Sequence, residues 1–259
     1  MSRNAPNSKE HIVKALEADI RYDGRKKEEF RKIEIETDIA VTGEGSARVK
    51  VGDCEVIAGV KLSLGTPYPD SPDEGVLMVG CELIPMAHPS LESGPPSIDA
   101  IEIGRVIDRG IREGHCIDAK QLCVEPGEKV WIVSVDVVPL NHDGNLIDVG
   151  GLAAMAAIKA TRFPVIEDGK VNYKELTDKK LEINETPIPV TVCKIGNQLF
   201  VDPTKVEEDA IEARITVTCL DDKRICSLQK GGSESFSIEQ LGDAFDIASK
   251  TSNELRKNL

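Results

Sequence analysis

The chain has 259 residues, of which 40% are apolar, so it is long enough for one large domain or two packed lobes with a substantial core. Its formal net charge of -13 excludes a protein covered in nonspecific nucleic-acid contacts, because these need clustered lysines and arginines; any nucleic-acid site must be local. Seven scattered cysteines without a CxxC pair indicate neither a disulfide framework nor a zinc site, and the sequence contains no apolar run of membrane-spanning length.

The first predicted elements are a helix and an antiparallel meander. The helix has an apolar face from Ile12 to Ile20 and ends at the Asp23–Gly24 turn. Alternating apolar and polar side chains then predict strands in residues 33–41, 46–52 and 54–64. The run GEGSAR lacks the Lys-Ser/Thr of a phosphate loop, so we expect a hairpin turn there.

Two helices and more strands complete the first half. Residues 76–87 read as a strand, and a helix follows over 98–114, with Gly114 as its stop signal. Two strands flank Pro126–Gly127, and the alanine-rich run 146–160 predicts a helix that is buried on most sides.

The second half also consists of strands followed by a helix, in a shorter segment. Residues 189–195 and 198–202 predict a hairpin, residues 213–220 and 224–232 predict two more strands, and a last amphipathic helix starts at the capping box of Ser237. We expect an N-terminal extension and helix in 1–30, a first lobe in 31–165, a polar connector in 166–187 and a second lobe in 188–259.

Three arginines lie on one side of the helix over 98–114. Arg105, Arg109 and Arg112 fall opposite the apolar stripe from Ile103 to Ile111, so they should face outward. One interpretation is a solvated helix face, in which Glu102 pairs with Arg105, Asp108 with Arg112 and Arg109 with Glu113. Each such pair would contribute only about 0.2 to 0.5 kcal/mol.

The other interpretation is a phosphate-binding row. A guanidinium binds phosphate oxygens bidentately, which an ammonium cannot do. Residues four apart on a helix are separated by about 6 Å along its axis, close to the spacing of phosphates on an extended strand. The row could therefore follow the backbone of single-stranded nucleic acid without reading its bases.

Several motifs together resemble the RNase PH family. They are RYDGRKKEEFRKIEI, GPPS, AIEIGRVIDRGIR, LCVEPGEKVWIVSVDVVPLNHDGNLIDVGGLAAMAAIKA and LFVDPTKVEEDA, and they span nearly the whole chain in a consistent order. The resemblance implies an α+β, RNase PH-type fold with mixed and antiparallel sheets covered by helices. It has two βα lobes: an N-terminal ribosomal protein S5 domain 2-like lobe and a smaller C-terminal RNase PH lobe.

More closely, these motifs look like those of the noncatalytic RNase PH-like subunit of the archaeal RNA exosome. This resemblance implies a hexameric ring of three heterodimers with a catalytic RNase PH-like subunit, S1/KH or zinc-ribbon cap subunits, and single-stranded RNA as ligand. Arg105 and Arg109 match the family's RNA-contacting pair, and Arg112 is a candidate third member.

The resemblance also implies that the chain itself does not catalyse phosphorolysis. Where active members carry Gly-Ser-Arg or Gly-Thr-Arg, this chain reads DGNLIDVGG and Asp148 stands in the arginine's place, so a carboxylate would repel phosphate. Active members also carry an acidic residue in a strand of the second lobe. In this chain the matching segment is EARITV, and Arg214 occupies that position. Asp202 matches the other acidic position, but Asp before proline is more often a turn residue.

Three interpretations of the function therefore remain open. We favour a noncatalytic, RNA-binding ring subunit without cofactor or metal, located in the cytoplasm. The alternatives are a self-sufficient phosphate-dependent exoribonuclease or tRNA-trimming enzyme that recruits phosphate through Arg214, and a purely structural ring component. His88, His115 and His142 have no acidic or serine partner at a telling spacing, so we expect them to be surface or loop residues rather than bases.

Overall fold

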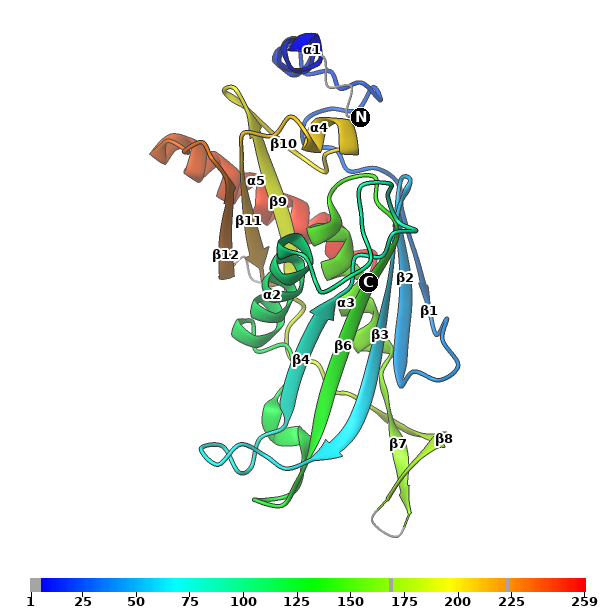
Figure 1. Ribbon diagram of the computed structural model, residues 1–259. Coiled ribbons are helices and arrows are strands. Elements are labelled where there is room, and N and C mark those ends of the chain that lie inside the picture. Colours follow the sequence, from blue (N-terminus) through cyan, green and yellow to red (C-terminus); the bar gives the residue numbers. More distant parts are fainter. Residues whose placement is uncertain (1–5, 168–169, 222–223) are drawn as a thin grey trace.

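The computed structural model describes residues 6–167, 170–221 and 224–259. They form two lobes, each built on one sheet, and an N-terminal segment that crosses the end of the second lobe (Figure 1). None of the helices in these ranges is both long and apolar enough to cross a membrane.

The first lobe is built on a six-stranded sheet. Its main path runs in the order β1-β2-β3-β6-β4, with β5 paired to β6, and all neighbours are antiparallel except β4 and β6. The strands are β1 (Ile33–Thr37), β2 (Gly45–Val51), β3 (Cys54–Gly65), β4 (Val76–Cys81), β5 (Cys123–Glu125) and β6 (Lys129–Asn141). A 3-10 helix, η1 (Ala119–Leu122), precedes β5. The predicted meander is thus confirmed.

The α-helices α2 (Ile98–Glu113) and α3 (Leu146–Ala160) contact this sheet. Helix α2 packs on β4, and α3 packs on β2, β3 and β6. Alternate residues of β3 are buried, which is the burial pattern expected of a strand with one face toward a core. Helix α3 also packs on the sheet of the second lobe, and all but two of its 15 residues are buried, as its composition predicts.

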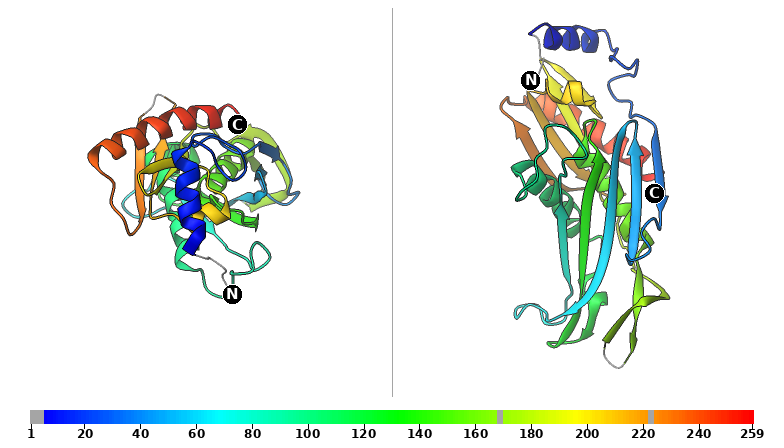
Figure 2. Two further views of the ribbon diagram at one scale, coloured as in Figure 1. Left: turned by 90° about the horizontal axis from the view of Figure 1, so that it is seen from above. Right: turned by 45° about the vertical axis from the view of Figure 1, so that its right-hand side comes forward.

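The second lobe is a four-stranded antiparallel sheet in the order β10-β9-β11-β12. Its elements are β9 (Ile188–Ile195), β10 (Gln198–Val201), the one-turn helix α4 (Lys205–Glu208), β11 (Ala213–Cys219), β12 (Ile225–Gly232) and α5 (Ile238–Arg256). Helix α5 starts at the predicted capping box of Ser237 and packs along β9 and β11. Helix α3 also packs on β9, so this strand lies in the layer between two helices (Figure 2).

The N-terminal segment is docked on the second lobe rather than extended into solvent. Helix α1 (Pro6–Glu17) ends earlier than the sequence predicts, and its Ile12 and Leu16 pack with Ile195 and Phe200 in a separate apolar cluster. The burial of these side chains anchors α1 to the β9–β10 hairpin.

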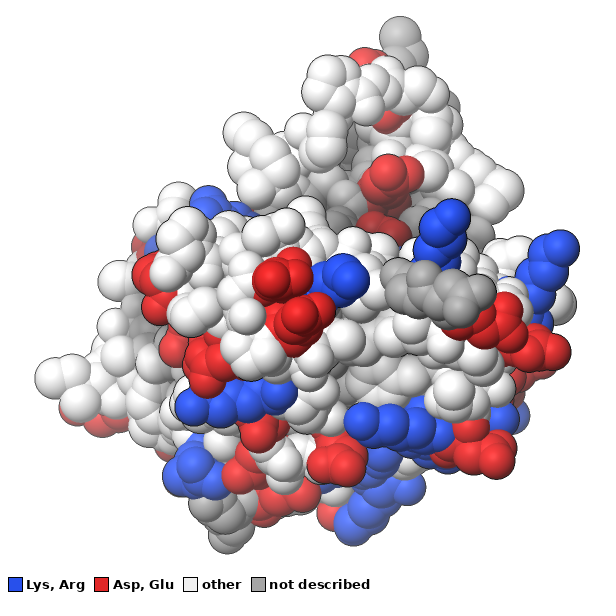
Figure 3. All heavy atoms as spheres, turned by 90° about the horizontal axis from the view of Figure 1, so that it is seen from below, with Lys and Arg blue, Asp and Glu red and all other residues white. Residues whose placement is uncertain are grey.

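A β-hairpin spans the expected boundary between the first lobe and the connector. Strand β7 (Arg162–Glu167) pairs antiparallel with β8 (Lys170–Lys180), while the Asp168–Gly169 turn lies outside the described residues. Most of β8 is exposed, so its sequence lacks the apolar alternation that predicts a half-buried strand. On the face seen in Figure 3, basic and acidic side chains are interspersed.

Helix α2 ends at Gly114, as predicted, but for a different physical reason. Gly114 is right-handed, with φ of -77°, and the left-handed residue is His115, with φ of 48°. A Cβ at position 114 would lie 2.5 Å from the carbonyl oxygen of Gly110. Close packing rather than backbone handedness therefore requires glycine here.

Candidate functional site

Helix α2 presents its arginines outward because its other face is fixed against the core. Ser97 Oγ caps the helix by accepting a hydrogen bond from the backbone N–H of Ala100, at 3.2 Å. Its apolar stripe from Ile103 to Ile111 is buried. Gly110 lies against β11, where a Cβ would be 3.0 Å from Thr218 Cγ2.

A groove of about 600 Å³ lies along the outer face of α2, between this helix and β12. Arg105 and Arg109 line it together with Gln229 of β12. Ile98 and Ile101 also line the groove, and both are at least half exposed. The groove thus combines two guanidinium groups with an apolar flank, and the carboxylates of Glu102 and Asp108 also line it.

The three arginines of the row differ in how their donors are used. Arg105 makes no hydrogen bond or ion pair with any residue in the described ranges, and Arg109 donates one long hydrogen bond, 3.4 Å from Nη1 to Gln229 Oε1. Arg112 is held by the carboxylate of Asp108, at 2.6 and 3.2 Å, and by the carbonyl oxygen of Leu77, at 3.0 Å. Arg105 and Arg109 therefore keep donors free for a ligand, whereas Arg112 has most of its donors engaged.

Only one of the three ion pairs expected for a solvated face is formed in the part of the chain that the structure describes. Asp108 pairs with Arg112, as predicted. Glu102 does not pair with Arg105 but reaches β11, where it accepts two hydrogen bonds from Arg214, at 2.8 and 3.2 Å. Arg109 bonds Gln229 rather than Glu113.

A second cavity, of about 320 Å³, lies at the junction of the two lobes. Its charged and polar lining includes Glu102, Arg214, His142, Lys205 and Glu208. The charged groups are paired: Glu102 binds Arg214, and Glu208 lies 3.3 Å from Lys205. Glu208 also lies 3.4 Å from His142. The cavity therefore offers no unpaired cation among these groups.

His142 lies in a loop, as predicted, but it has an acidic partner that its place in the sequence does not reveal. Its Nε2 faces Glu208 of α4, and its ring makes an edge contact with His88 at 5.6 Å between centroids. Burial lowers the pKa of His142, against the charge of Glu208, and Lys205 and His88 lower it further. His88 itself bonds Ser90, at 2.7 Å between Nδ1 and Oγ.

Asn145 lies at the start of α3, beside this cavity. It adopts a left-handed conformation, with φ of 61°, and its backbone N–H donates to Glu208 Oε1 at 3.0 Å. Its Nδ2 donates to Asp202, whereas its Oδ1 is buried without a hydrogen-bond partner in the described residues. The first turn of α3 is thus held by acidic residues of the second lobe.

Asp148 does not line the cavity, contrary to the expectation that its carboxylate would face the phosphate position. It is fully buried and accepts hydrogen bonds from the backbone N–H and the hydroxyl of Thr191, at 2.9 and 2.7 Å. Burial raises the pKa of Asp148 to about 7, although the bonds from Thr191 act in the opposite direction. Asp148 joins α3 to β9 and leaves no cation at this position.

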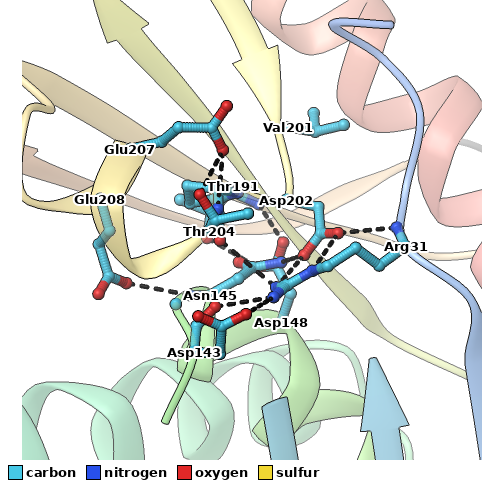
Figure 4. Close-up of polar contacts among 12 residues, drawn as sticks. Arg31, Asp143, Asn145, Asp148, Thr191, Val201, Asp202, Thr204, Glu207 and Glu208 are labelled. Carbon is cyan, nitrogen blue, oxygen red and sulfur yellow. Dashed lines mark hydrogen bonds and ion pairs between the residues drawn. The ribbon is translucent and has the colours of Figure 1, made fainter. Parts of the chain in front are cut away.

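Asp202 is the centre of a buried ion cluster rather than a simple turn residue (Figure 4). Its carboxylate accepts bonds from Arg31, through Nε, Nη2 and the backbone N–H, and from Arg25 and Asn145. Arg31 also binds Asp143, at 3.0 Å. Burial alone would raise the pKa of Asp202, but the hydrogen bonds and charges of Arg31 and Arg25 lower it.

Gln229 and Gly231 are not among the site residues that the sequence predicts. Both lie on β12, two residues apart, so strand alternation places them on one face of the sheet. Gly231 stands opposite Arg214 in the register of β11 and β12. The only signal in the sequence was this spacing, which does not reveal that α2 packs above it. In residues 6–167, 170–221 and 224–259, no group of three or more His, Cys, Asp or Glu side chains could hold a metal ion.

Comparisons with known proteins give consistent matches over most of the chain. The model of the 3' exoribonuclease family, domain 1, matches residues 29–164, and that of domain 2 matches residues 185–251. The chain is 44% identical over 250 residues to exosome complex component Rrp42 of Methanopyrus kandleri, covering 96% of this chain and 94% of the relative. It is 41% identical over 259 residues to Rrp42 of Thermococcus kodakarensis, covering 97% and 93%.

Two solved structures have the same architecture. A chain of the Archaeoglobus fulgidus exosome with RNA bound to the active site superposes with a TM-score of 0.91 at 39% identity, covering 97% of each chain. A chain of an archaeal exosome core superposes with a TM-score of 0.86 at 36% identity, covering 97% of this chain and 95% of that one. These similarities confirm the predicted two-lobed α+β fold.

Proposed function

This chain belongs to the 3' exoribonuclease family, which is the RNase PH family, and we propose that it is a noncatalytic, RNA-binding ring subunit of an RNA exosome. The proposal extends to this chain the role that its relatives are named for, exosome complex component. It also assigns the groove on α2 to single-stranded RNA.

The observation that carries the proposal is the state of the arginines in the groove. Arg105 has no partner in the described residues and Arg109 has one long hydrogen bond, so both guanidinium groups can donate to phosphate oxygens. Their rise of about 6 Å along the helix suits consecutive phosphates of an extended strand. Since these arginines would contact the RNA backbone only, binding would be independent of RNA sequence.

The absence of catalysis is supported by the residues at the positions where active members of the family carry catalytic groups. Arg214 stands in place of an acidic residue and is paired with Glu102. Asp202, which matches the other acidic position, is enclosed by Arg31 and Arg25. Asp148 stands where an arginine would bind phosphate, and it bonds Thr191 instead.

A ring would bring this chain beside a catalytic RNase PH-like subunit, in a trimer of heterodimers that also binds S1/KH or zinc-ribbon cap subunits. In that arrangement Arg105 and Arg109 hold RNA that the neighbouring subunit degrades from its 3' end. The structure of an exosome with RNA at its active site, to which this chain is similar, supports RNA as the ligand.

Phosphorolysis assays test the catalytic part of the proposal. The purified chain, incubated with single-stranded RNA and inorganic phosphate, should release no nucleoside diphosphate, whereas the chain assembled with a catalytic RNase PH-like partner should. Phosphate-dependent degradation by the chain alone would instead support a self-sufficient enzyme. In that case Arg214→Ala should abolish activity, while in a noncatalytic subunit it should leave the ring's rate at saturating RNA nearly unchanged.

RNA binding by the assembled ring tests the role of the groove. Arg105→Ala combined with Arg109→Ala should weaken binding of a single-stranded oligoribonucleotide and reduce the slope of log affinity against log salt by about 0.7 for each phosphate that is no longer neutralised. Arg48→Ala is the matched control, because Arg48 is an exposed arginine on β2 that pairs with Glu36. If the double variant and the control had equal affinities and slopes, the row would be only a surface feature.

A further inference from the structure

Arg214 lies at the centre of a contact between the two lobes. It extends from β11 to α2, where its two terminal nitrogens donate to the two carboxylate oxygens of Glu102, at 3.2 and 2.8 Å. Both side chains are about three-quarters buried, at 24% and 22% exposed. A bidentate pair of this kind fixes the orientation of both groups.

Gly231 provides the space in which the Arg214 guanidinium lies. The two residues are opposite each other in the antiparallel register of β11 and β12. A Cβ at position 231 would lie 2.6 Å from Arg214 Cζ and 2.7 Å from Nη1. Any larger residue would displace the end of the arginine side chain, so the glycine permits Arg214 to reach across β12 toward α2.

Gln229 continues the contact from Glu102 to the groove. Its Nε2 donates to Glu102 Oε1 at 3.3 Å, and its Oε1 accepts from Arg109 Nη1 at 3.4 Å. The carboxylate can only accept and the guanidinium can only donate, so the orientation of the amide is determined at both ends. Although burial acts to raise the pKa of Glu102, Arg214 and Gln229 lower it, so this carboxylate is ionised at neutral pH.

The result is a continuous hydrogen-bonded series, Arg214–Glu102–Gln229–Arg109, in which donors and acceptors alternate. Within this series, only Arg109 belongs to the row that the RNA proposal uses. Arg105 lines the same groove but bonds no member of the series, and it has no other partner in the described residues. The two arginines therefore differ in whether their guanidinium is held before a ligand arrives.

We propose that Arg214, Glu102 and Gln229 are positioning residues that hold the Arg109 guanidinium ready for an RNA phosphate. This inference rests on the proposed function. Arg214 thereby takes part in RNA binding from a position where active members of the family carry an acidic residue. It acts through Glu102 and Gln229 rather than by touching the ligand.

The size of the effect follows from the conformational freedom of one long side chain. Immobilising such a side chain on binding lowers affinity by about two- to tenfold relative to a preorganised one. The 3.3 and 3.4 Å bonds are longer than usual, which is consistent with a modest effect.

Two substitutions break the series without changing the net charge or the arginines. Gln229→Leu removes the amide that links Glu102 to Arg109. Gly231→Ala removes no polar group, but its added Cβ displaces the Arg214 guanidinium. Gly242→Ala on α5 is the matched control, since a Cβ there meets no atom within 4 Å.

The experiment measures binding of a fluorescently labelled single-stranded oligoadenylate to the assembled ring without phosphate, together with thermal unfolding of each variant. Gln229→Leu and Gly231→Ala should each weaken binding by about two- to tenfold in the wild-type and Arg105→Ala backgrounds. In the Arg109→Ala background they should have no further effect. Gly242→Ala should bind as the wild type does.

Two results would overturn the inference while leaving the proposed function intact. One is that Arg109→Ala weakens binding but neither Gln229→Leu nor Gly231→Ala does. The other is that these variants weaken binding equally in the Arg109→Ala background, which would indicate a general structural effect. Unchanged affinity in both Arg105→Ala and Arg109→Ala is a separate result, because it would overturn the proposed function itself.

Discussion

Two groups of arginines in this molecule have opposite environments. Arg31 lies at the junction of the N-terminal segment and both lobes, where it binds Asp202 and Asp143, and its side chain is only 8% exposed. Arg105 lies on the outer face of α2, is exposed and has no partner in the described residues. A guanidinium whose donors are all engaged can only hold the fold together, whereas one with free donors can bind a ligand.

Buried carboxylates show the same dependence on partners. Asp202 is surrounded by arginines that lower its pKa against the effect of burial, so it is ionised. Asp148 is as deeply buried, but its hydrogen-bond donors belong to Thr191 and are neutral, and burial raises its pKa to about 7. Neighbouring charge, rather than depth, decides the direction in which each pKa moves.

The largest expected effect is on stability, from the engaged arginine. Arg31→Ala should lower the free energy of unfolding by about 3 to 5 kcal/mol, because it leaves part of the buried charge of Asp202 without its main partner. Urea unfolding of the variant and the wild type measures this. If Arg31→Ala lowered the free energy of unfolding no more than the replacement of an exposed arginine does, the engaged and free arginines would not differ in their contribution to stability.

An effect of comparable total size, but spread over pH, is expected from Asp148→Asn. The folded protein keeps the Asp148 proton up to about pH 7, whereas the unfolded chain releases it near its ordinary pKa of 3.8. This group therefore lowers the stability of the wild type as pH rises from about 4 to about 7, with a slope of at most about 1.4 kcal/mol per pH unit.

Asparagine cannot titrate, so the stability of Asp148→Asn relative to the wild type should rise across that interval and stay constant above it. Urea unfolding at several pH values from about 4 to about 8 measures the difference. A difference that did not vary with pH would show that Asp148 ionises equally in the folded and unfolded chains.

Arg112 tests the intermediate case, an exposed arginine with engaged donors. Arg112→Ala should cost only about 0.2 to 0.5 kcal/mol of stability, since Arg112 is half exposed and its i,i+4 pair with Asp108 is screened by salt. RNA affinity of the ring should fall less than in Arg109→Ala. An equal or greater fall would mean that Arg112 releases Asp108 and binds phosphate.

Arg105→Ala should have the smallest effect on stability. Because Arg105 has no partner in the described residues, and because alanine is the stronger helix former, the free energy of unfolding should stay within about 0.5 kcal/mol of the wild type. Its effect should appear in RNA binding alone. A clear decrease in stability would show that the Arg105 side chain stabilises the fold and is therefore not free to bind a ligand.

Much of the fold was predictable because it depends on local patterns. Helix α2 ends where Gly114 predicted, α5 begins at the capping box of Ser237, and the buried α3 follows from its alanine-rich composition. The β7–β8 hairpin was not predicted, since β8 is mostly exposed and charged and lacks the apolar alternation on which strand prediction relies.

The sequence by itself determined the family, the order of the elements and the outward direction of Arg105, Arg109 and Arg112, because motifs and helical periodicity are local properties. Only the tertiary structure decided which of these arginines is free. Glu102 could pair with Arg105 one turn away, yet it pairs with Arg214, which lies 112 positions along the chain on another lobe. Such a pair forms because the packing of sheets and helices brings the two side chains together. Their separation in the sequence does not indicate that they are in contact.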